Sequence, residues 1–166
     1  MKIILLSMML PFVALMVPLF RMFSGAGLLN STLGFVLPSL STPFLIMMFR
    51  TAARSFPSDI IEAARIDGLS ELGIFFRMFI PTMRSTFAAA LTVTFMGAWN
   101  NYLWPKVIMQ DNKAQTLPMM ISNLTSGYLT DYGSLMLAVL ITTLPTAILF
   151  LCLQKNFAEG ITGAVK

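Results

Sequence analysis

The sequence predicts an all-α membrane protein: a polytopic bundle of four spanning helices, with a short extra helix in the loop between the second and third. Two observations predict this fold class. Of the 166 residues, 57% are hydrophobic and 11% are charged, whereas soluble domains carry about 25% charged residues. The apolar residues also form four runs close to the roughly 20 residues that a spanning helix needs. Because a soluble domain of this size leaves much of its surface exposed, we expect lipid to cover this one.

The four predicted spans cover about residues 3–20, 33–49, 87–108 and 134–153 of a single membrane domain over residues 1–166. The first run follows Lys2, as in a signal peptide, but it is too long for one and no small-residue cleavage site follows it. We therefore expect it to remain as a span. Prolines interrupt the first, second and fourth runs, and we expect kinks there, because neighbouring helices in a membrane bundle can satisfy the freed carbonyls.

Charge predicts the orientation of these spans. Residues 50–84 hold five arginines, whereas the two shorter connections carry little positive charge. The positive-inside rule places residues 50–84 in the cytoplasm, so both termini are expected there and the connection over about 109–133 outside. The net charge of +4 does not indicate nucleic-acid binding, because the basic residues are dispersed along the chain and form no patch.

A short helix is predicted inside the cytoplasmic loop, within residues 56–68. Pro57 suits a first helical turn, Asp59 and Glu62 place negative charge near the positive end of the helix dipole, and Gly68 supplies a left-handed stop. These signals predict a helix of about ten residues between Pro57 and Gly68. Its spacing gives one apolar face, made of Phe56, Ile60, Ala63 and Ala64. A plain surface helix tucked under the bundle would show the same pattern.

The same loop resembles a family motif. Glu62-Ala63-Ala64, three residues, Gly68, nine residues and then Met78-Phe79-Ile80-Pro81 resembles the EAA motif of binding-protein-dependent ABC importers. Met78 and Ile80 replace the usual Ile and Leu, and the spacing matches throughout. Further segments resemble the carbohydrate-uptake permeases, the subclass that includes the inner subunits for maltose and glycerol phosphate: Gly27-Leu28-Leu29-Asn30, Gly97-Ala98-Trp99-Asn100, Leu103-Trp104-Pro105, Thr116-Leu117-Pro118 and the tail 160–166.

The resemblance implies a permease subunit that forms half of the pathway for a sugar or oligosaccharide in the inner membrane. It implies an ABC ATPase dimer, a second permease subunit and an extracytoplasmic solute-binding protein as partners. The loop would dock onto the ATPase through Glu62, Ala63, Ala64, Arg65, Asp67, Gly68 and Pro81. In the alternative interpretation, Glu62 only stabilises its own helix.

No phosphate-binding G-x-x-x-x-G-K-[ST] loop occurs in the sequence. We therefore expect no enzyme activity, cofactor or metal in this chain, with ATP used by the partner ATPase. Members of the family usually carry six spans, with the EAA loop between the fourth and fifth. Here the loop follows the second predicted span, so we expect the chain to correspond to the last four spans.

Polar residues inside the spans are candidates for lining the pathway, because such side chains usually face the bundle interior. Asn100 and Asn101 lie late in the third predicted span, and Thr142 and Thr143 lie in the middle of the fourth. Amides and hydroxyls suit a sugar, whose hydroxyl groups need hydrogen bonds. Alternatively, threonine bonds its own helix backbone, and the neighbouring residues Trp99, Tyr102 and Trp104 form an aromatic belt.

Two other functions stay open. A secondary transporter would need no ATPase, but it would more often carry charged residues inside its spans, where this chain has essentially none. A truncated permease remnant without activity is the second alternative. The solute is expected from the subclass alone: a sugar or oligosaccharide first, then glycerol phosphate or another polyol, since no Arg or Lys cluster lies within the spans to hold a phosphate.

Overall fold

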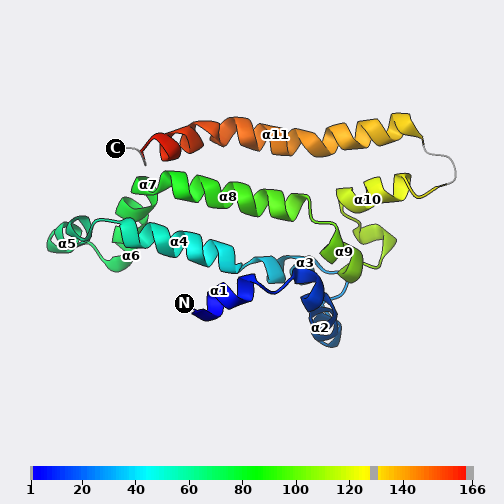
Figure 1. The fold of residues 1–166 in the computed structure, drawn as a ribbon, viewed down its shortest axis with the longest axis horizontal. Coiled ribbons are helices and arrows are strands. Elements are labelled where there is room, and N and C mark those ends of the chain that lie inside the picture. The colour runs from blue at the N-terminus through cyan, green and yellow to red at the C-terminus, as the bar shows by residue number, and fades with distance from the viewer. Residues whose placement is uncertain (1, 128–130, 164–166) are drawn as a thin grey trace.

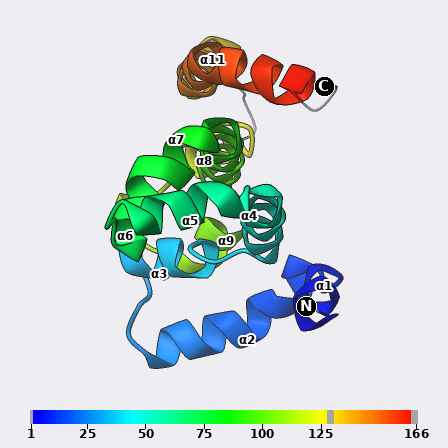
Figure 2. The same ribbon diagram turned by 90° about the vertical axis from the view of Figure 1, so that its left-hand side faces the viewer.

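The computed structural model describes residues 2–127 and 131–163, and every regular element in these ranges is a helix. Helices α11 (Tyr132–Gly163), α8 (Arg84–Trp99), α4 (Pro43–Ser55) and α1 (Lys2–Met8) form successive layers. α11 packs on α8, α8 packs on α4, and α4 packs on α1, as Figures 1 and 2 show from two directions. The layers explain why α8 is the most enclosed of them.

α8 is built to be enclosed, because its packed positions are small. Ala88, Ala90 and Thr92 are its buried residues, and the Thr92 hydroxyl donates to the Ala88 carbonyl at 2.9 Å. Small side chains let neighbouring backbones approach closely, as in other membrane helix pairs. The Trp99 indole N–H then joins two layers by donating to the Thr142 carbonyl of α11 at 2.9 Å.

The first predicted span, 3–20, is two helices rather than one kinked helix. α1 ends at Met8, α2 runs over Phe12–Gly25, and the two are bent by 98°. Pro11 lies at this break, where it lacks a backbone N–H and disfavours a helical conformation at Leu10. Pro18 is accommodated inside α2, so only one of the two prolines ends a helix.

The second predicted span, 33–49, is also divided. α3 (Thr32–Val36) and the 3-10 turn η1 (Leu37–Ser39) precede α4, with a bend of 46°. Thr42 caps α4 by accepting from the Leu45 N–H at 3.4 Å, and Pro43 occupies the first helical position, where its missing N–H is not needed. α4 then continues beyond the predicted end to Ser55.

The third predicted span, 87–108, is broken at residues 100–102. α8 ends at Trp99 and a separate helix, α9 (Leu103–Ile108), follows. Asn100 donates from its side chain to the Met96 carbonyl at 3.1 Å, and Asn101 accepts from the Trp104 N–H at 3.4 Å. Two amide side chains that compete for backbone partners therefore end one helix and begin the next.

Trp104 is part of a buried joint between α2, α3 and α9, and it lies in no aromatic belt. It is 1% exposed, its indole N–H donates to the Gly34 carbonyl at 3.1 Å, and its ring meets those of Phe12 and Phe23 edge-on at 6.1 and 5.6 Å. Gly34 has no room for a side chain, since a Cβ there would lie 2.1 Å from the Leu28 carbonyl oxygen.

Asn30, an exposed residue, ties the chain before α3 to the chain after α9 at the edge of the joint. Its side-chain oxygen accepts from the N–H groups of Gln110 and Asp111 at 2.6 and 2.9 Å, and its own N–H donates to the Ile108 carbonyl at 3.0 Å. The turn η3 (Asn112–Ala114) and helix α10 (Leu117–Leu124) follow, and α10 packs against α11. α9 and α10 lie at the opposite end of the layers from α5 (Ser58–Ile66) (Figure 1).

α11 extends the fourth predicted span, 134–153, at both ends. Its segment Tyr132–Gln154 is long and apolar enough to cross a membrane, with a mean hydropathy of 2.4 and none of the tested window buried. The bent pairs α1–α2 and α3/η1–α4 bring the possible spans among the described residues to three. α8, with 16 residues, is shorter than the roughly 20 that a full crossing needs. The number of four spans stays a prediction.

Candidate functional site

The predicted loop helix is present as α5 (Ser58–Ile66), at one end of the layers (Figure 1). It has nine residues. Pro57 precedes it with extended backbone angles (φ −63°, ψ 126°), and Asp59 lies in its first turn. The prediction of a short helix with sharp ends is confirmed.

α5 ends in a complete Schellman cap. Gly68 adopts φ +78°, the Leu69 N–H donates to the Ala64 carbonyl at 3.0 Å, and the Gly68 N–H donates to the Arg65 carbonyl at 3.0 Å. These are the 6→1 and 5→2 bonds of the motif. Asp67 is the C-cap residue. Gly68 therefore has the predicted role of turning the chain sharply at the helix end.

α5 buries one side and exposes the other, but the buried side is not the predicted set. Ala64 is 1% exposed and Phe56 8% exposed, and Ile60 and Ile61 are half-buried, whereas Ala63 is exposed. Successive residues on a helix point about 100° apart, and here the bundle lies on the side of Ile60, Ile61 and Ala64, which leaves Ala63 outside the covered face. Ala63 thus joins Glu62 and Asp67 on the exposed surface.

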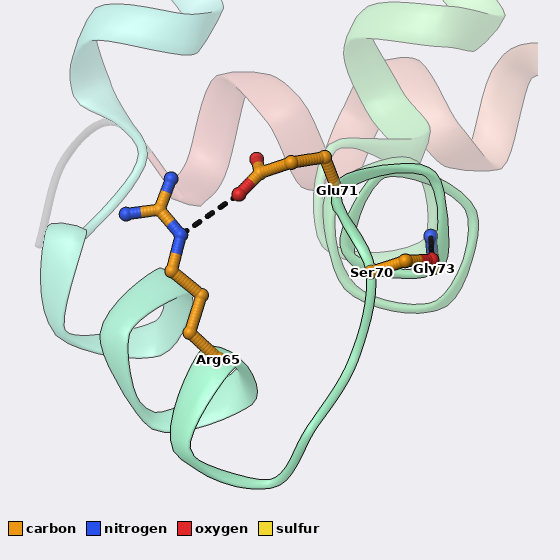
Figure 3. A network of polar contacts seen from close by, with 4 residues as sticks. All are labelled: Arg65, Ser70, Glu71 and Gly73. Atoms are coloured by element: carbon orange, nitrogen blue, oxygen red, sulfur yellow. Dashed lines mark hydrogen bonds and ion pairs between the residues drawn. The ribbon is translucent and has the colours of Figure 1, made fainter.

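An ion pair closes the turn after α5. Arg65 Nε donates to Glu71 Oε1 at 2.9 Å, and Ser70 Oγ caps α6 (Glu71–Ile74) by accepting from the Gly73 N–H at 3.2 Å (Figure 3). The Glu71 carboxylate raises the pKa of Arg65, mainly through the hydrogen bond. Both side chains are more than half exposed, so the pair orients the turn and adds little to stability.

Pro81 is reached through an unusual segment. The π-helical turn η2 (Phe75–Phe79) follows α6, and the short helix α7 (Ile80–Thr82) contains Pro81. Pro81 is exposed. It lies at the junction with α8, whereas Glu62–Gly68 form the α5 end. The motif residues thus lie in two separate parts of the loop: Glu62–Gly68 before the π turn and Pro81 after it.

The predicted pathway residues make mostly local bonds. Asn100 and Asn101 cap the two helices at the α8–α9 break, and Asn100 is exposed. The hydroxyls of Thr142 and Thr143 each donate to the carbonyl four residues earlier in α11, at 2.8 Å. The two hydroxyls therefore bond their own helix backbone, as the alternative interpretation of these threonines expected. The asparagine amides retain capacity for other partners.

Sequence reasoning missed three features of this end of the molecule. It did not find Glu71 as the partner of Arg65. It did not single out Ile66, which is 87% exposed beside the charged residues of α5. It also missed a cluster of phenylalanine rings beneath α5. The signal for the cluster was the density of phenylalanine over residues 75–79, which the motif match left unexplained.

This geometry defines an all-helical membrane domain with one short, capped helix exposed at the end of the bundle. Comparison with known proteins gives its family. Residues 1–163 match the family described as "Binding-protein-dependent transport system inner membrane component", and the chain belongs to that family. It corresponds to the membrane permease component of an ABC transporter and not to the ATPase.

Relatives come from several transport systems. The chain is 44% identical over 164 residues to the lactose transport system permease protein LacG of Rhizobium radiobacter, covering 99% of this chain and 60% of that protein. It is 38% identical to the arabinooligosaccharides transport system permease protein AraQ of Bacillus subtilis, covering 99% and 59%. It is 31% identical to the sn-glycerol-3-phosphate transport system permease protein UgpE of Yersinia pestis, again covering 99% and 59%.

A solved structure has the same fold. A chain of a bacterial ABC transporter involved in the import of the acidic polysaccharide alginate matches with a TM-score of 0.79 and 22% identity, covering 93% of this chain and 60% of that one. The chain thus spans about 60% of the length of these relatives. The helical arrangement described above is therefore shared with a chain of that transporter.

Proposed function

We propose that the chain is part of the permease subunit of an ATP-driven importer, that it forms half of the pathway for a sugar or oligosaccharide, and that α5 couples it to a separate ATPase. One observation carries the proposal: a rigid helix with an exposed polar surface holds the Glu62-Ala63-Ala64 and Gly68 pattern in a chain that belongs to this family.

The shape of α5 suits the transfer of movement. Both ends are sharp, Gly68 closes the C-terminal cap, and the ion pair of Arg65 with Glu71 orients the following turn. Ala63 offers a small exposed surface between Glu62 and Asp67, so a partner's groove can approach closely while the carboxylates meet basic groups. Movement of the groove would then displace α5 as a unit.

The proposal includes an ATPase dimer, a second permease subunit and an extracytoplasmic solute-binding protein. The family's description as binding-protein-dependent supports the last of these. Large exposed apolar side chains along α1, α2 and α11 supply surface for lipid and for the second permease. In this arrangement α5 and both termini face the cytoplasm, in agreement with the arginines of residues 50–84.

The proposed solute is a neutral sugar or oligosaccharide, which the names of the lactose and arabinooligosaccharide relatives support. Asn100 and Asn101, at the break between α8 and α9, are the proposed pathway residues, because their amides lie where the helix ends. Uptake of lactose, arabinotriose and glycerol 3-phosphate by the complete transporter would rank the candidates. A preference for glycerol 3-phosphate would contradict the proposed class.

The coupling role is tested with Glu62→Ala combined with Gly68→Pro in the complete transporter, and with Asp111→Asn as the control. Asp111 is an exposed carboxylate in the connection between α9 and α10, two helices that lie at the opposite end of the layers from α5 (Figure 1). We expect the double variant to insert normally in the membrane but to lose lactose uptake and uptake-linked ATP hydrolysis, and the control to retain both. Normal uptake by the double variant, or lactose uptake without any ATPase, would overturn the coupling role.

A further inference from the structure

The phenylalanine rings beneath α5 connect that helix to the bundle. We propose that Phe79 is a positioning residue that fixes the orientation of α5 relative to α4 and α8, and so carries ATPase movement into the membrane helices. The inference rests on the proposed function of α5. We define the ring cluster as Phe49, Phe56, Phe75, Phe79 and Phe87.

Phe79 is the hub of the ring cluster. Its ring lies 5.3 Å from that of Phe56, 5.7 Å from that of Phe75 and 6.1 Å from that of Phe87, measured between centroids. Phe56 immediately precedes Pro57 and α5, while Phe87 belongs to α8. One side chain therefore contacts the entrance of α5, the π turn and α8 at distances typical of interacting rings.

α4 joins the same cluster. Phe49 in α4 lies 4.9 Å from Phe87 in α8, and Phe75 lies 6.4 Å from Phe87. Ring contacts therefore run continuously from the α4–α5 junction at Phe56 into α8 and back to α4. The junction is enclosed, since Phe56 is 8% exposed. Phe49, Phe75, Phe79 and Phe87 also line an apolar hollow, so the path consists of ring contacts beside open space, and chains of packed side chains of this kind can carry coupling between sites.

The π turn η2 positions the ring of Phe79. In η2 the Ile80 N–H bonds to the Phe75 carbonyl, five residues back, and the rings of Phe75 and Phe79 are stacked with an interplanar angle of 17°. A reason for the wide turn lies next to it: in a regular α-helix, Pro81 would lack the N–H for the Arg77 carbonyl and its ring would press on that carbonyl. π turns of this kind are frequent at functional sites.

Phe76 offers a matched control in the same turn. Its side chain is 62% exposed, and its ring meets that of Phe75 at 5.1 Å. Removing the Phe76 ring changes the same residue type in the same helix turn, but it leaves the contacts of Phe79 with Phe56 and Phe87 in place. Phe79→Leu is the conservative variant, because it retains apolar volume without the ring.

The first experiment measures orientation. In a Cys152→Ser background, nitroxide labels at Asp59→Cys in α5 and Leu91→Cys in α8, both exposed positions, report the distance distribution between the helices by pulsed electron resonance. We expect Phe79→Ala to broaden or shift the distribution, Phe79→Leu to restore it in part and Phe76→Ala to leave it unchanged. An unchanged distribution in Phe79→Ala would overturn the proposal.

The second experiment measures coupling in the complete transporter. We expect Phe79→Ala to retain binding of the ATPase to membranes, since the exposed surface of α5 is untouched, while lactose uptake per ATP hydrolysed falls about threefold or more. Phe76→Ala should keep the parent ratio. A parent ratio in Phe79→Ala would contradict the role of the ring. If the parent chain binds no ATPase, the proposed function fails instead, and the label distances still decide whether Phe79 orients α5.

Discussion

α2 and α5 end in the same way, yet the chain after them meets opposite environments. Gly27 (φ +69°) and Gly68 (φ +78°) occupy equivalent positions, and the 6→1 bonds are 2.9 Å from Leu28 to Phe23 and 3.0 Å from Leu69 to Ala64. After Gly27 the chain enters the buried joint around Trp104. After Gly68 it passes through an exposed turn closed by an ion pair.

The difference shows that a helix cap is a local device that can serve either a packed joint or a free surface. At the joint, shape is decisive: Gly34 has no space for a methyl group, and an indole donor meets a buried carbonyl. A Cβ would meet nothing within 4 Å at either cap glycine, Gly27 or Gly68, so the difference lies in the chain that follows, which at the α5 end is exposed over residues 70–72. The first region is closed within the chain, and the second is available to a partner.

The largest expected effect comes from removing the indole at the joint. Trp104→Ala should lower the free energy of unfolding in detergent by about 3–5 kcal/mol, because it empties a fully buried site. Trp104→Phe retains ring volume and should lose less, about 1–3 kcal/mol, through the Gly34 carbonyl left without its donor. Equal stability of all three proteins would contradict a closed joint.

The next effect distinguishes a glycine without room for a methyl group, Gly34, from one that has such room, Gly25. Gly34→Ala should destabilise the protein by about 1–3 kcal/mol or more, because the new methyl group would press on the Leu28 carbonyl and force the backbone to move. The measurement is again unfolding in detergent. Gly25→Ala is the control, since a Cβ at Gly25 meets nothing within 4 Å, and it should leave stability nearly unchanged.

At Gly68 the expected effect is smaller and local. Gly68→Ala strains the left-handed backbone by about 1–2 kcal/mol, so the α5 cap should open more often. Hydrogen exchange of the Leu69 amide, which bonds the Ala64 carbonyl, should become faster. Gly68→Asn should exchange at a rate between the two, because asparagine tolerates this conformation. Faster exchange at Leu28, at the equivalent cap of α2, would show that the effect is not local.

The smallest effect concerns a cap made by a side chain. Asp131 accepts from the Ser134 hydroxyl at 2.6 Å and from the Gly133 N–H at 3.0 Å, and the Ser134 bond is the main cause of its lowered pKa. The folded pKa lies below the unfolded one, so this stabilisation is present above the usual carboxyl range and is lost as pH falls through the depressed folded value. The protection of the Gly133 and Ser134 amides, which is their exchange rate relative to the intrinsic rate at the same pH, should therefore fall on acidification.

Asp131→Asn keeps one oxygen that can accept from the Gly133 and Ser134 N–H groups, but it replaces the oxygen that accepts from the Ser134 hydroxyl and removes the titrating carboxyl. Its exchange rates, after correction for intrinsic chemistry, should no longer depend on pH in that window. A pH dependence that persists in this variant would assign the titration to another group. Both bonds of the α5 cap run between backbone groups, which do not titrate. The same acidification should therefore leave the protection of the Leu69 amide unchanged.

Much of the candidate site could be predicted because its signals are local. Pro57 and Asp59 mark the start of α5 through backbone angles and first-turn charge, and Gly68 marks its end through cap bonds that reach three and five residues back. The phase of the helix could not be predicted in the same way: whether Ala63 or Ala64 is buried depends on which side the bundle lies. Likewise the apolar run over 87–108 hid the capping bonds of Asn100 and Asn101, which divide it into α8 and α9.

The sequence by itself determined that the protein is helical and apolar, where its short loop helix begins and ends, and to which family pattern that helix belongs. All of these depend on composition or on neighbours along the chain. Tertiary structure alone decided that Trp104 is buried, through an acceptor 70 residues away at Gly34, and that Phe56, Phe79 and Phe87 meet in one cluster. The physical reason is that burial and ring contact depend on distances between segments, which spacing along the chain does not specify.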